Sequence, residues 1–233
     1  MQTSIKKKPH SIGFIFDLDG TLVDTEGLYK KSLFSLLKKY NLEPPSEEKY
    51  GTYTGFSNDV YIEELFNYKS TKKILKQELL EEIEKNMTKD GISAIPGIFE
   101  ILQLLAPQKN IALFIASTSS KEWIKKCLEV KHVFNNTFIS YRSFFNENYI
   151  SCEEVPRPKP YPDVFIEAHK HMGQPNNIYI VGDSISDVEA GIAAKMKVFF
   201  ISNTVDTYKE HKDVITCSNA LFLFKEIEKL FIS

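Results

Sequence analysis

The sequence predicts an α/β protein in which a doubly wound parallel sheet carries an inserted, all-helical second domain. Three observations favour this fold class. Short, almost entirely apolar segments alternate with amphipathic ones, which is typical of strands buried on both faces and of helices that cover them. About eighty residues near the N-terminus interrupt this alternation. The length of 233 residues also exceeds the usual size of one domain, about 150 residues.

Each predicted strand is brief and rich in aromatic or β-branched residues. The expected strands cover residues 12–16, 110–116, 177–181 and 197–201. The stretches between them have apolar residues at helical spacing. The expected helices of this part cover residues 98–105, 120–130, 162–172 and 185–195. Strands and helices in this order imply right-handed crossovers within one parallel sheet.

The interruption lies between the first strand and residue 97 and contains no convincing strand. Helical patterns cover residues 25–40, 57–67 and 71–88. A crossover between neighbouring strands needs far less chain than this. We therefore predict a helical domain at residues 24–94, inserted into an α/β core domain made of residues 1–23 and 95–233.

A second irregular segment covers residues 131–160, which we expect to be loop-like. Its aromatic residues could close a sheet edge or form a small flap near the cleft, and we favour the sheet edge. These residues are Phe144, Phe145 and Tyr149. Three prolines between residues 156 and 160 keep the end of the segment extended.

Composition and charge exclude several classes of protein. A hydrophobic content of 42% with 26% charged residues is typical of globular proteins. The net charge of −2 lacks the basic excess of a nucleic-acid binder, and no apolar run reaches the 18 or so residues of a membrane span. The basic N-terminal segment precedes an apolar stretch too short for a signal peptide. We therefore expect a monomeric cytoplasmic protein that binds neither nucleic acid nor membranes.

Cysteine and arginine usage narrows the chemistry further. The three cysteines are widely spaced, which suits a reducing compartment and offers no zinc site. Only two of the 29 basic residues are arginines, Arg142 and Arg157. A phosphate group would therefore have to be held by lysine, backbone amides or a metal ion.

Polar residues follow three of the predicted strands, at the end where an α/β sheet places its active site. They are Asp17, Asp19, Ser117, Thr118, Asp183 and Asp187. Lys159 lies in the proline-rich segment between them. Singly, each residue has an ordinary explanation as a turn former, a helix cap or a solvated charge. Turn chemistry does not account well for the whole set, so we interpret the strand ends as one functional site.

A calcium loop of the EF-hand type is excluded at the first of these strand ends. Such a loop needs glycine at its sixth position and glutamate at its twelfth. Counted from Asp17, those positions hold Leu22 and Leu28.

The remaining interpretation is a phosphoryl site. Three carboxylates placed together, from Asp17, Asp19 and Asp183, repel one another and raise each other's pKa. Mg²⁺ relieves this repulsion and keeps coordination positions open for a phosphate oxygen. Lys159 and Ser117, with the turn amides, could complete a cage for the phosphoryl group. A carboxylate nucleophile would then form an aspartyl-phosphate intermediate.

These motifs resemble those of the haloacid dehalogenase superfamily, in the subfamily of β-phosphoglucomutase-like enzymes and phosphatases with a helical (C1-type) cap. The four matching segments are DLDGT at 17–21, ST at 117–118, RPKPYPD at 157–163 and GDSISD at 182–187. IPG at 95–97 resembles the point where the cap rejoins the core. The resemblance covers nearly the whole chain and implies a Rossmann-like core. It also implies a Mg²⁺-dependent phosphatase acting on a small phosphorylated metabolite, such as a sugar phosphate or a nucleotide-like monoester.

The resemblance implies catalytic roles for two residues. Asp17 would be the nucleophile and a Mg²⁺ ligand. Asp19 would protonate the leaving oxygen and then activate water, while its backbone carbonyl binds the metal. The dehalogenase branch lacks an acid at this second position, so Asp19 favours phosphate chemistry.

The resemblance also implies the residues that hold the metal and the phosphate. Asp183 would be a further metal ligand, and Asp187 would support the metal site and Lys159 from nearby. The phosphoryl oxygens would be held by Ser117, the Thr118 amide and Lys159.

The cap is expected to set the substrate by closing over the leaving group and excluding water. The expected specificity loop comprises Tyr53, Thr54, Gly55, Phe56, Ser57 and Asn58. Tyr53 and Phe56 could equally belong to the core of the cap. In β-phosphoglucomutase-like relatives this loop carries an arginine that grips a second phosphate, and the predicted cap has no arginine. Hydrolysis is therefore favoured over mutase chemistry.

Two alternatives stay open. A phosphomutase of the β-phosphoglucomutase type would use the same core residues. A receiver-like signalling module also combines an acidic cluster, a hydroxyl and a lysine on a doubly wound sheet, but it has no use for a helical lid.

Overall fold

The computed structural model describes residues 11–52, 62–134, 137–202, 208 and 210–232. Its internal contacts divide the chain into two compact units. The larger unit contains residues 1–24 and 93–233, and the smaller one residues 25–92.

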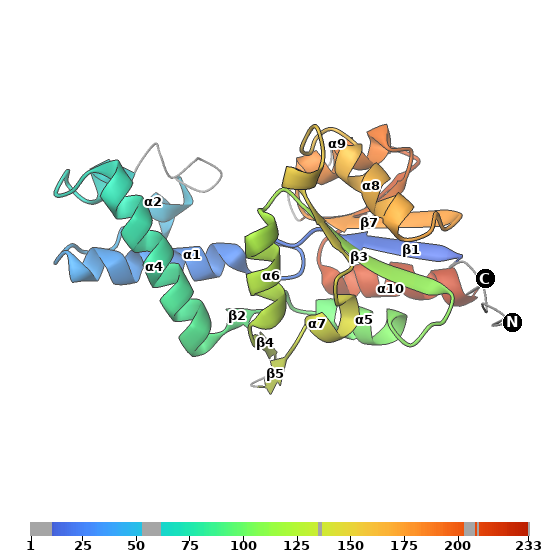
Figure 1. Cartoon of the computed structure of the whole chain (residues 1–233), viewed down its shortest axis with the longest axis horizontal. Coiled ribbons are helices and arrows are strands. Elements are labelled where there is room, and N and C mark those ends of the chain that lie inside the picture. The colour runs from blue at the N-terminus through green and yellow to red at the C-terminus, as the bar shows by residue number, and fades with distance from the viewer. Residues whose placement is uncertain (1–10, 53–61, 135–136, 203–207, 209, 233) are drawn as a thin grey trace, which may run out of the picture. The chain divides into compact units, whose positions relative to one another are not determined.

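A six-stranded sheet forms the centre of the larger unit (Figure 1). Its spatial order is β6 (Tyr149–Ser151), β3 (Ile111–Ser117), β1 (Ile12–Phe16), β7 (Asn177–Gly182), β8 (Lys197–Ile201) and β9 (Val214–Cys217). All the described strand pairs of this sheet are parallel. The predicted α/β fold class is confirmed.

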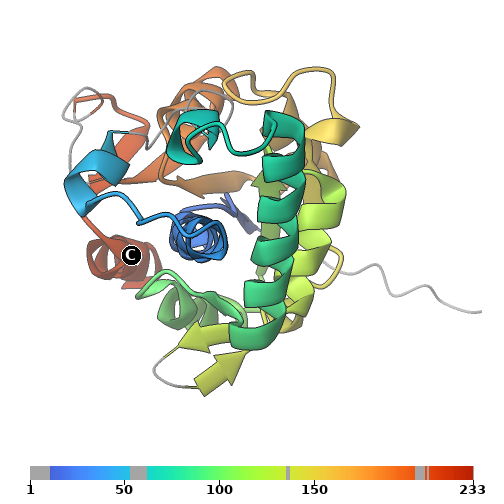
Figure 2. The ribbon, with the colours of Figure 1, turned by 90° about the vertical axis from the view of Figure 1, so that its left-hand side faces the viewer.

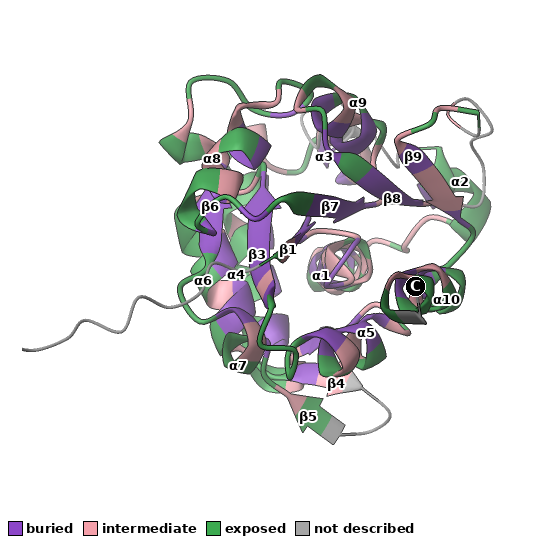
Figure 3. Ribbon diagram, turned by 90° about the vertical axis from the view of Figure 1, so that its right-hand side faces the viewer, coloured by how far each residue is buried: buried purple, intermediate pink, exposed green. Residues whose placement is uncertain are grey.

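The central strands are buried on both faces, which explains why their sequences are apolar without alternation. In β1, Phe14, Ile15 and Phe16 are fully buried, and Figure 3 shows the neighbouring strands β3 and β7 as mostly buried. Below β1 in Figures 1 and 3 lie α5 (Ile98–Leu105) and α10 (Ala220–Ile232). Above it lie α8 (Asp163–His171) and α9 (Ile185–Ala193).

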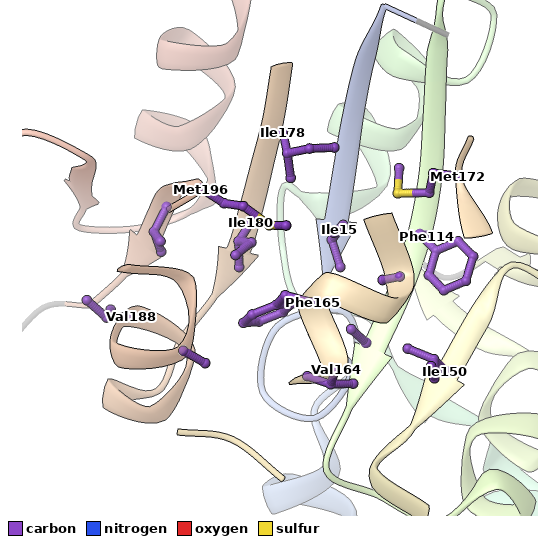
Figure 4. Close-up of a cluster of buried hydrophobic side chains, with 14 of the residues drawn as sticks. Ile15, Phe114, Ile150, Val164, Phe165, Met172, Ile178, Ile180, Val188 and Met196 are labelled. Atoms are coloured by element: carbon purple, nitrogen blue, oxygen red, sulfur yellow. The ribbon is translucent and has the colours of Figure 1, made fainter. Parts of the chain in front are cut away.

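One hydrophobic cluster fills the space between the sheet and the helices α8 and α9. Figure 4 shows Ile15 and Ile180 from the central strands facing Phe165 of α8. All three side chains are fully buried. This packing holds the strands that end at the candidate site in a fixed register.

The expectation that residues 131–160 are loop-like is wrong. The segment contains β4 (His132–Phe134), β5 (Thr137–Ile139), α7 (Arg142–Phe145), β6 and the 3₁₀ helix η1 (Cys152–Glu154). Each element has only three or four residues, which is too short for a periodic pattern. The pair β4–β5 forms a three-stranded sheet with β2 (Ile92–Ser93).

Of the aromatic residues named in this segment, Tyr149 lies on the sheet edge that we favoured, whereas Phe145 packs on a central strand. Phe145 is fully buried and meets Phe16 edge-on, with ring centroids 5.9 Å apart. Tyr149 begins β6, which is the edge strand beside β3. Near the C-terminus, β9 and α10 are elements that the sequence analysis did not predict.

The chain leaves and re-enters the larger unit at adjacent points. Val23 and Ala94 form an antiparallel bridge, and the Asp24 amide donates to the Ser93 carbonyl over 2.8 Å. The Ile95 amide donates to the Leu22 carbonyl over 3.1 Å. The two connecting segments are thus hydrogen-bonded to each other.

The smaller unit is built from α1 (Thr25–Lys39), α2 (Glu47–Gly51), α3 (Ile62–Leu65) and α4 (Lys72–Asp90). Figure 2 shows α1 end-on and α4 along its length. Leu33 and Leu37 of α1 and Leu75 and Leu79 of α4 are buried. Residues 57–61 of the helix predicted at 57–67 lie outside the described residues, and α3 falls within the described remainder.

Within the described ranges, no helix combines the length and the apolarity that crossing a lipid bilayer would need.

Candidate active site

The strand register brings the predicted strand ends together. Phe16, the last residue of β1, pairs with Ile115 of β3 and with Val181 of β7. Parallel strands in register end at the same edge of a sheet, where α/β proteins place their sites. Asp17 and Asp183, which directly follow β1 and β7, therefore lie at one edge.

Lys159 is buried between two carboxylates. Its Nζ donates to Asp17 Oδ1 over 2.7 Å and to Asp187 Oδ1 over 2.6 Å. The side chains of Lys159, Asp17 and Asp187 are 1%, 9% and 0% exposed. The sequence analysis placed all three at one site, and the structure brings them into direct contact.

This arrangement contains too little positive charge for its carboxylates. Burial, and next the negative charge of Asp187, raise the pKa of Asp17 to about 8, although Lys159 opposes the shift. Burial alone would disfavour the charged ammonium of Lys159, but the attraction of Asp17 and Asp187 raises the pKa of Lys159 overall. Asp17 and Asp187 share a single ammonium, so a further cation at this position would stabilise both as carboxylates.

Asp183 adds a third carboxylate. Thr21 Oγ1 donates to Asp183 Oδ1 over 2.6 Å, while burial raises the pKa of Asp183. The Asp183 carboxylate can lie this close to the first turn because residue 20 is glycine. Gly20 has φ +80°, and a Cβ added there would lie only 2.3 Å from Asp183 Oδ2. Glycine adopts this backbone conformation without a steric penalty.

Carboxylate oxygens of Asp17, Asp183 and Asp187 all lie within 4.8 Å of one another. Hard oxygen ligands in a cluster short of positive charge fit a cation such as Mg²⁺. Both oxygens of Asp187 already accept hydrogen bonds, since Lys159 donates to Oδ1 and the Ser184 hydroxyl to Oδ2 over 2.6 Å. Asp17 and Asp183 are therefore the better candidates for direct metal ligands.

Asp19 points to a different set of partners. Ser119 Oγ donates to Asp19 Oδ2 over 2.6 Å, and Trp123 Nε1 donates to Asp19 Oδ1 over 3.0 Å. Ser117 Oγ lies 3.5 Å from Asp19 Oδ2. The predicted phosphate-binding hydroxyl and the predicted acid–base residue are thus neighbours.

Three residues at this edge were missed by the sequence analysis: Thr21, Ser119 and Trp123. Thr21 is part of the first motif but was given no role. Ser119 directly follows the second motif. Trp123 is the chain's single tryptophan, and its rarity is the one feature of the sequence that could have drawn attention to it.

Thr118 and the specificity loop are two further predicted parts of the site. Thr118 is exposed at the end of β3, and its carbonyl accepts a hydrogen bond from the Cys152 thiol. The expected specificity loop at residues 53–58 lies outside the described residues.

Comparison with known proteins identifies the family and several relatives. The sequence model of a family described as haloacid dehalogenase-like hydrolase matches residues 14–201. The chain is 27% identical over 186 residues to the pyrophosphatase PpaX of Oceanobacillus iheyensis, covering 78% of this chain and 79% of that one. It is also 27% identical over 197 residues to hexitol phosphatase A of Escherichia coli, covering 84% and 85%. A phosphoglycolate phosphatase of Nitrosococcus oceani is 24% identical over 206 residues, covering 84% and 85%.

Solved structures share the fold. A protein of Thermotoga maritima, described provisionally as a β-phosphoglucomutase, has a TM-score of 0.76 at 19% identity, covering 94% of this chain and 99% of that one. A hydrolase of Deinococcus radiodurans, solved with bound phosphate and sodium, has a TM-score of 0.66 at 22% identity, covering 96% and 95%.

Proposed function

The chain belongs to the haloacid dehalogenase-like hydrolases, and from this premise we propose that it is a Mg²⁺-dependent phosphatase of a small phosphorylated metabolite. Its relatives are named phosphatases. The observation that carries the proposal is the buried contact of Lys159 with Asp17, next to a second carboxylate at Asp183. A nucleophile, a fixed positive charge and ligands for a cation thus lie at one edge of the sheet.

In the proposed first step, a carboxylate oxygen of Asp17 forms a bond to phosphorus while the bond from phosphorus to the ester oxygen breaks. Asp19 gives a proton to the departing oxygen. In the second step, water attacks phosphorus, Asp19 takes a proton from the water, and the bond from phosphorus to Asp17 breaks. The products are the free alcohol and inorganic phosphate, and both aspartates return to their starting states.

Other residues at this edge would hold the phosphoryl group. Lys159, whose position is fixed by two carboxylates, can neutralise one phosphoryl oxygen, and Ser117 with the Thr118 amide can donate to the others. The Asp17 and Asp183 side chains and the Asp19 carbonyl would hold Mg²⁺, with Asp187 in support. The ion would supply charge neutralisation for the transferring group.

The substrate class rests on the relatives and on the smaller unit. A sugar phosphate or a nucleotide-like monoester suits an enzyme whose relatives include phosphatases of hexitol phosphates and phosphoglycolate. We propose that residues 24–94 act as the cap that selects the leaving group. The lack of arginine in this segment supports a substrate with a single phosphate.

A phosphomutase is the second candidate, because the Thermotoga maritima neighbour carries that description. A mutase must hold a second phosphate while the first is transferred, and arginine is the usual group for that task. The cap segment offers only lysines, so hydrolysis is the preferred function.

The test is a screen of phosphorylated metabolites for free phosphate, with Mg²⁺ and with EDTA. Asp17→Asn should lower phosphate release at least about 10³-fold with every substrate, since it removes the nucleophile. Asp213→Asn is the matched control, because Asp213 directly precedes β9 and thus lies at the opposite end of the strands. Full activity in Asp17→Asn would refute the mechanism. Isomerisation of a sugar monophosphate without phosphate release would identify the mutase.

A further inference from the structure

We infer that Trp123 and Ser119 are positioning residues, which hold the Asp19 carboxylate in the orientation needed for both steps of the reaction. The inference rests on the proposed function, in which Asp19 serves the leaving oxygen and then the attacking water. It assigns a positioning role to two side chains that lie outside the four motifs.

The two donors hold opposite ends of one carboxylate. The indole Nε1 of Trp123 binds Oδ1 over 3.0 Å, and the hydroxyl of Ser119 binds Oδ2 over 2.6 Å. One hydrogen bond would leave the carboxylate free to turn about that bond. Two donors on different oxygens fix both its position and its plane.

Trp123 is itself held in place by the start of α6 (Lys121–Glu129). Its backbone amide donates to the hydroxyl of the N-cap residue Ser120 over 3.2 Å. The N-cap fixes the first turn of the helix, and Trp123 lies in that turn. The indole ring therefore extends from a rigid element, which is what a precise site requires.

Ser119 is held by the edge strand β6. The buried hydroxyl of Ser151 donates to the Ser119 carbonyl over 2.7 Å, and the Ser119 amide donates to Ser117 Oγ over 3.0 Å. Ser151 pairs with Ser117 in the sheet register. The position of Asp19 is thus coupled to the sheet through Ser119.

Among the described residues, loss of these donors would leave the Asp19 side chain with the distant Ser117 hydroxyl, at 3.5 Å. An acid–base group that is displaced by about 1 Å loses on the order of 10²-fold in rate. Whether the first reaction step slows as much as the second depends on the leaving group of the substrate. A weakly basic leaving group such as p-nitrophenolate departs without a proton, whereas water must always lose one to complete hydrolysis.

Rapid-mixing kinetics with p-nitrophenyl phosphate and Mg²⁺ separate the two steps. We expect Trp123→Phe and Ser119→Ala to release one equivalent of nitrophenolate per enzyme at the parent rate. Steady turnover should then be 10- to 100-fold slower than in the parent, because the phosphoenzyme accumulates. With glycerol 2-phosphate, whose alkoxide needs a proton, the first step should slow as well. Glu122→Gln, an exposed neighbour of Trp123 on α6, is the control and should match the parent.

The single tryptophan gives a readout that needs no activity. Because the Trp123 indole touches Asp19 directly, Asp19→Ala should change the emission maximum and intensity of the folded protein. Glu122→Gln should leave both unchanged. If the emission does not respond to Asp19→Ala, Trp123 does not contact Asp19 in solution, and the inference is overturned.

The outcomes separate this inference from the proposed function. A parent protein that cleaves no phosphate ester would end the proposed function, and the inference with it, even if the emission test succeeded. An active parent whose Trp123→Phe and Ser119→Ala variants keep full turnover would overturn the inference alone. A burst and a steady rate that fall together would also overturn it, because a general structural defect affects both.

Discussion

We predict that His132 on β4 makes the stability of the larger unit depend on pH. Its side chain is fully buried, and its ring lies 4.1 Å from that of Tyr141, measured between centroids. Within the described part of the chain, neither ring nitrogen has a hydrogen-bond partner of normal geometry. Burial lowers the pKa of His132 from 6.5 to about 4, although the nearby backbone of Cys127 and Ile139 offsets part of the shift.

The sign and size of the effect follow from this shift. The unfolded chain takes up a proton at His132 below pH 6.5, whereas the folded protein does so only below about pH 4. The free energy of unfolding should therefore fall as the pH is lowered through this window, by about 1.4 kcal/mol per pH unit. The whole window is worth about 3 kcal/mol.

Urea unfolding between pH 7 and pH 4, followed by circular dichroism, measures this effect in the parent and in His132→Leu. The raised pKa of Asp17, about 8, changes stability in the opposite sense over the same range. Only the difference between the two proteins therefore isolates His132. Replacement of the exposed His171 by Gln is the control and should follow the parent curve. A difference between parent and His132→Leu that is the same at every pH would refute the reasoning.

Four further predictions concern the site and its supports. EDTA should abolish phosphate release and added Mg²⁺ should restore it; activity that persists in EDTA would contradict the metal assignment. Lys159→Met should lower the free energy of unfolding by about 3 kcal/mol or more, since it leaves the fully buried Asp187 carboxylate without its ammonium partner, and a loss below about 1 kcal/mol in urea unfolding would argue against this buried ion pair. Gly20→Ala should raise the Mg²⁺ concentration needed for half-maximal activity, because its Cβ would lie 2.3 Å from Asp183 Oδ2; an unchanged requirement would show that the turn can relax. Tyr141→Phe should cost about 1–2 kcal/mol in thermal unfolding, since the Tyr141 hydroxyl donates to the buried Leu22 carbonyl over 3.0 Å, and an unchanged midpoint would mean that water replaces it.

The parts of the fold that could be predicted are those with long, uniform local signals. The central strand β1 is apolar on both faces, so its end, and with it Asp17, could be located from the sequence alone. The edge strand β6 could not, because three residues carry no period and its pairing with β3 depends on the tertiary structure. The predicted loop at 131–160 failed for this reason.

The candidate site shows the same limit. Motif spacing located Asp17, Lys159 and Asp183, because each follows or precedes a recognisable element. It could not show that the partners of Asp19 would be Ser119 and Trp123, which are 100 and 104 positions away in the chain. Hydrogen bonds at such separations are set by packing, and local sequence does not encode them.

The hydrogen-bonded junction at Val23 and Ala94 has an evolutionary consequence. Since the two ends of the inserted segment lie side by side, the core sheet would keep its connectivity if the segment were shortened, lengthened or exchanged. Domain insertions succeed at sites of this kind because little chain is needed to rejoin the host. The sequence and length of residues 25–92 can therefore change while the strands that carry the carboxylates keep their order.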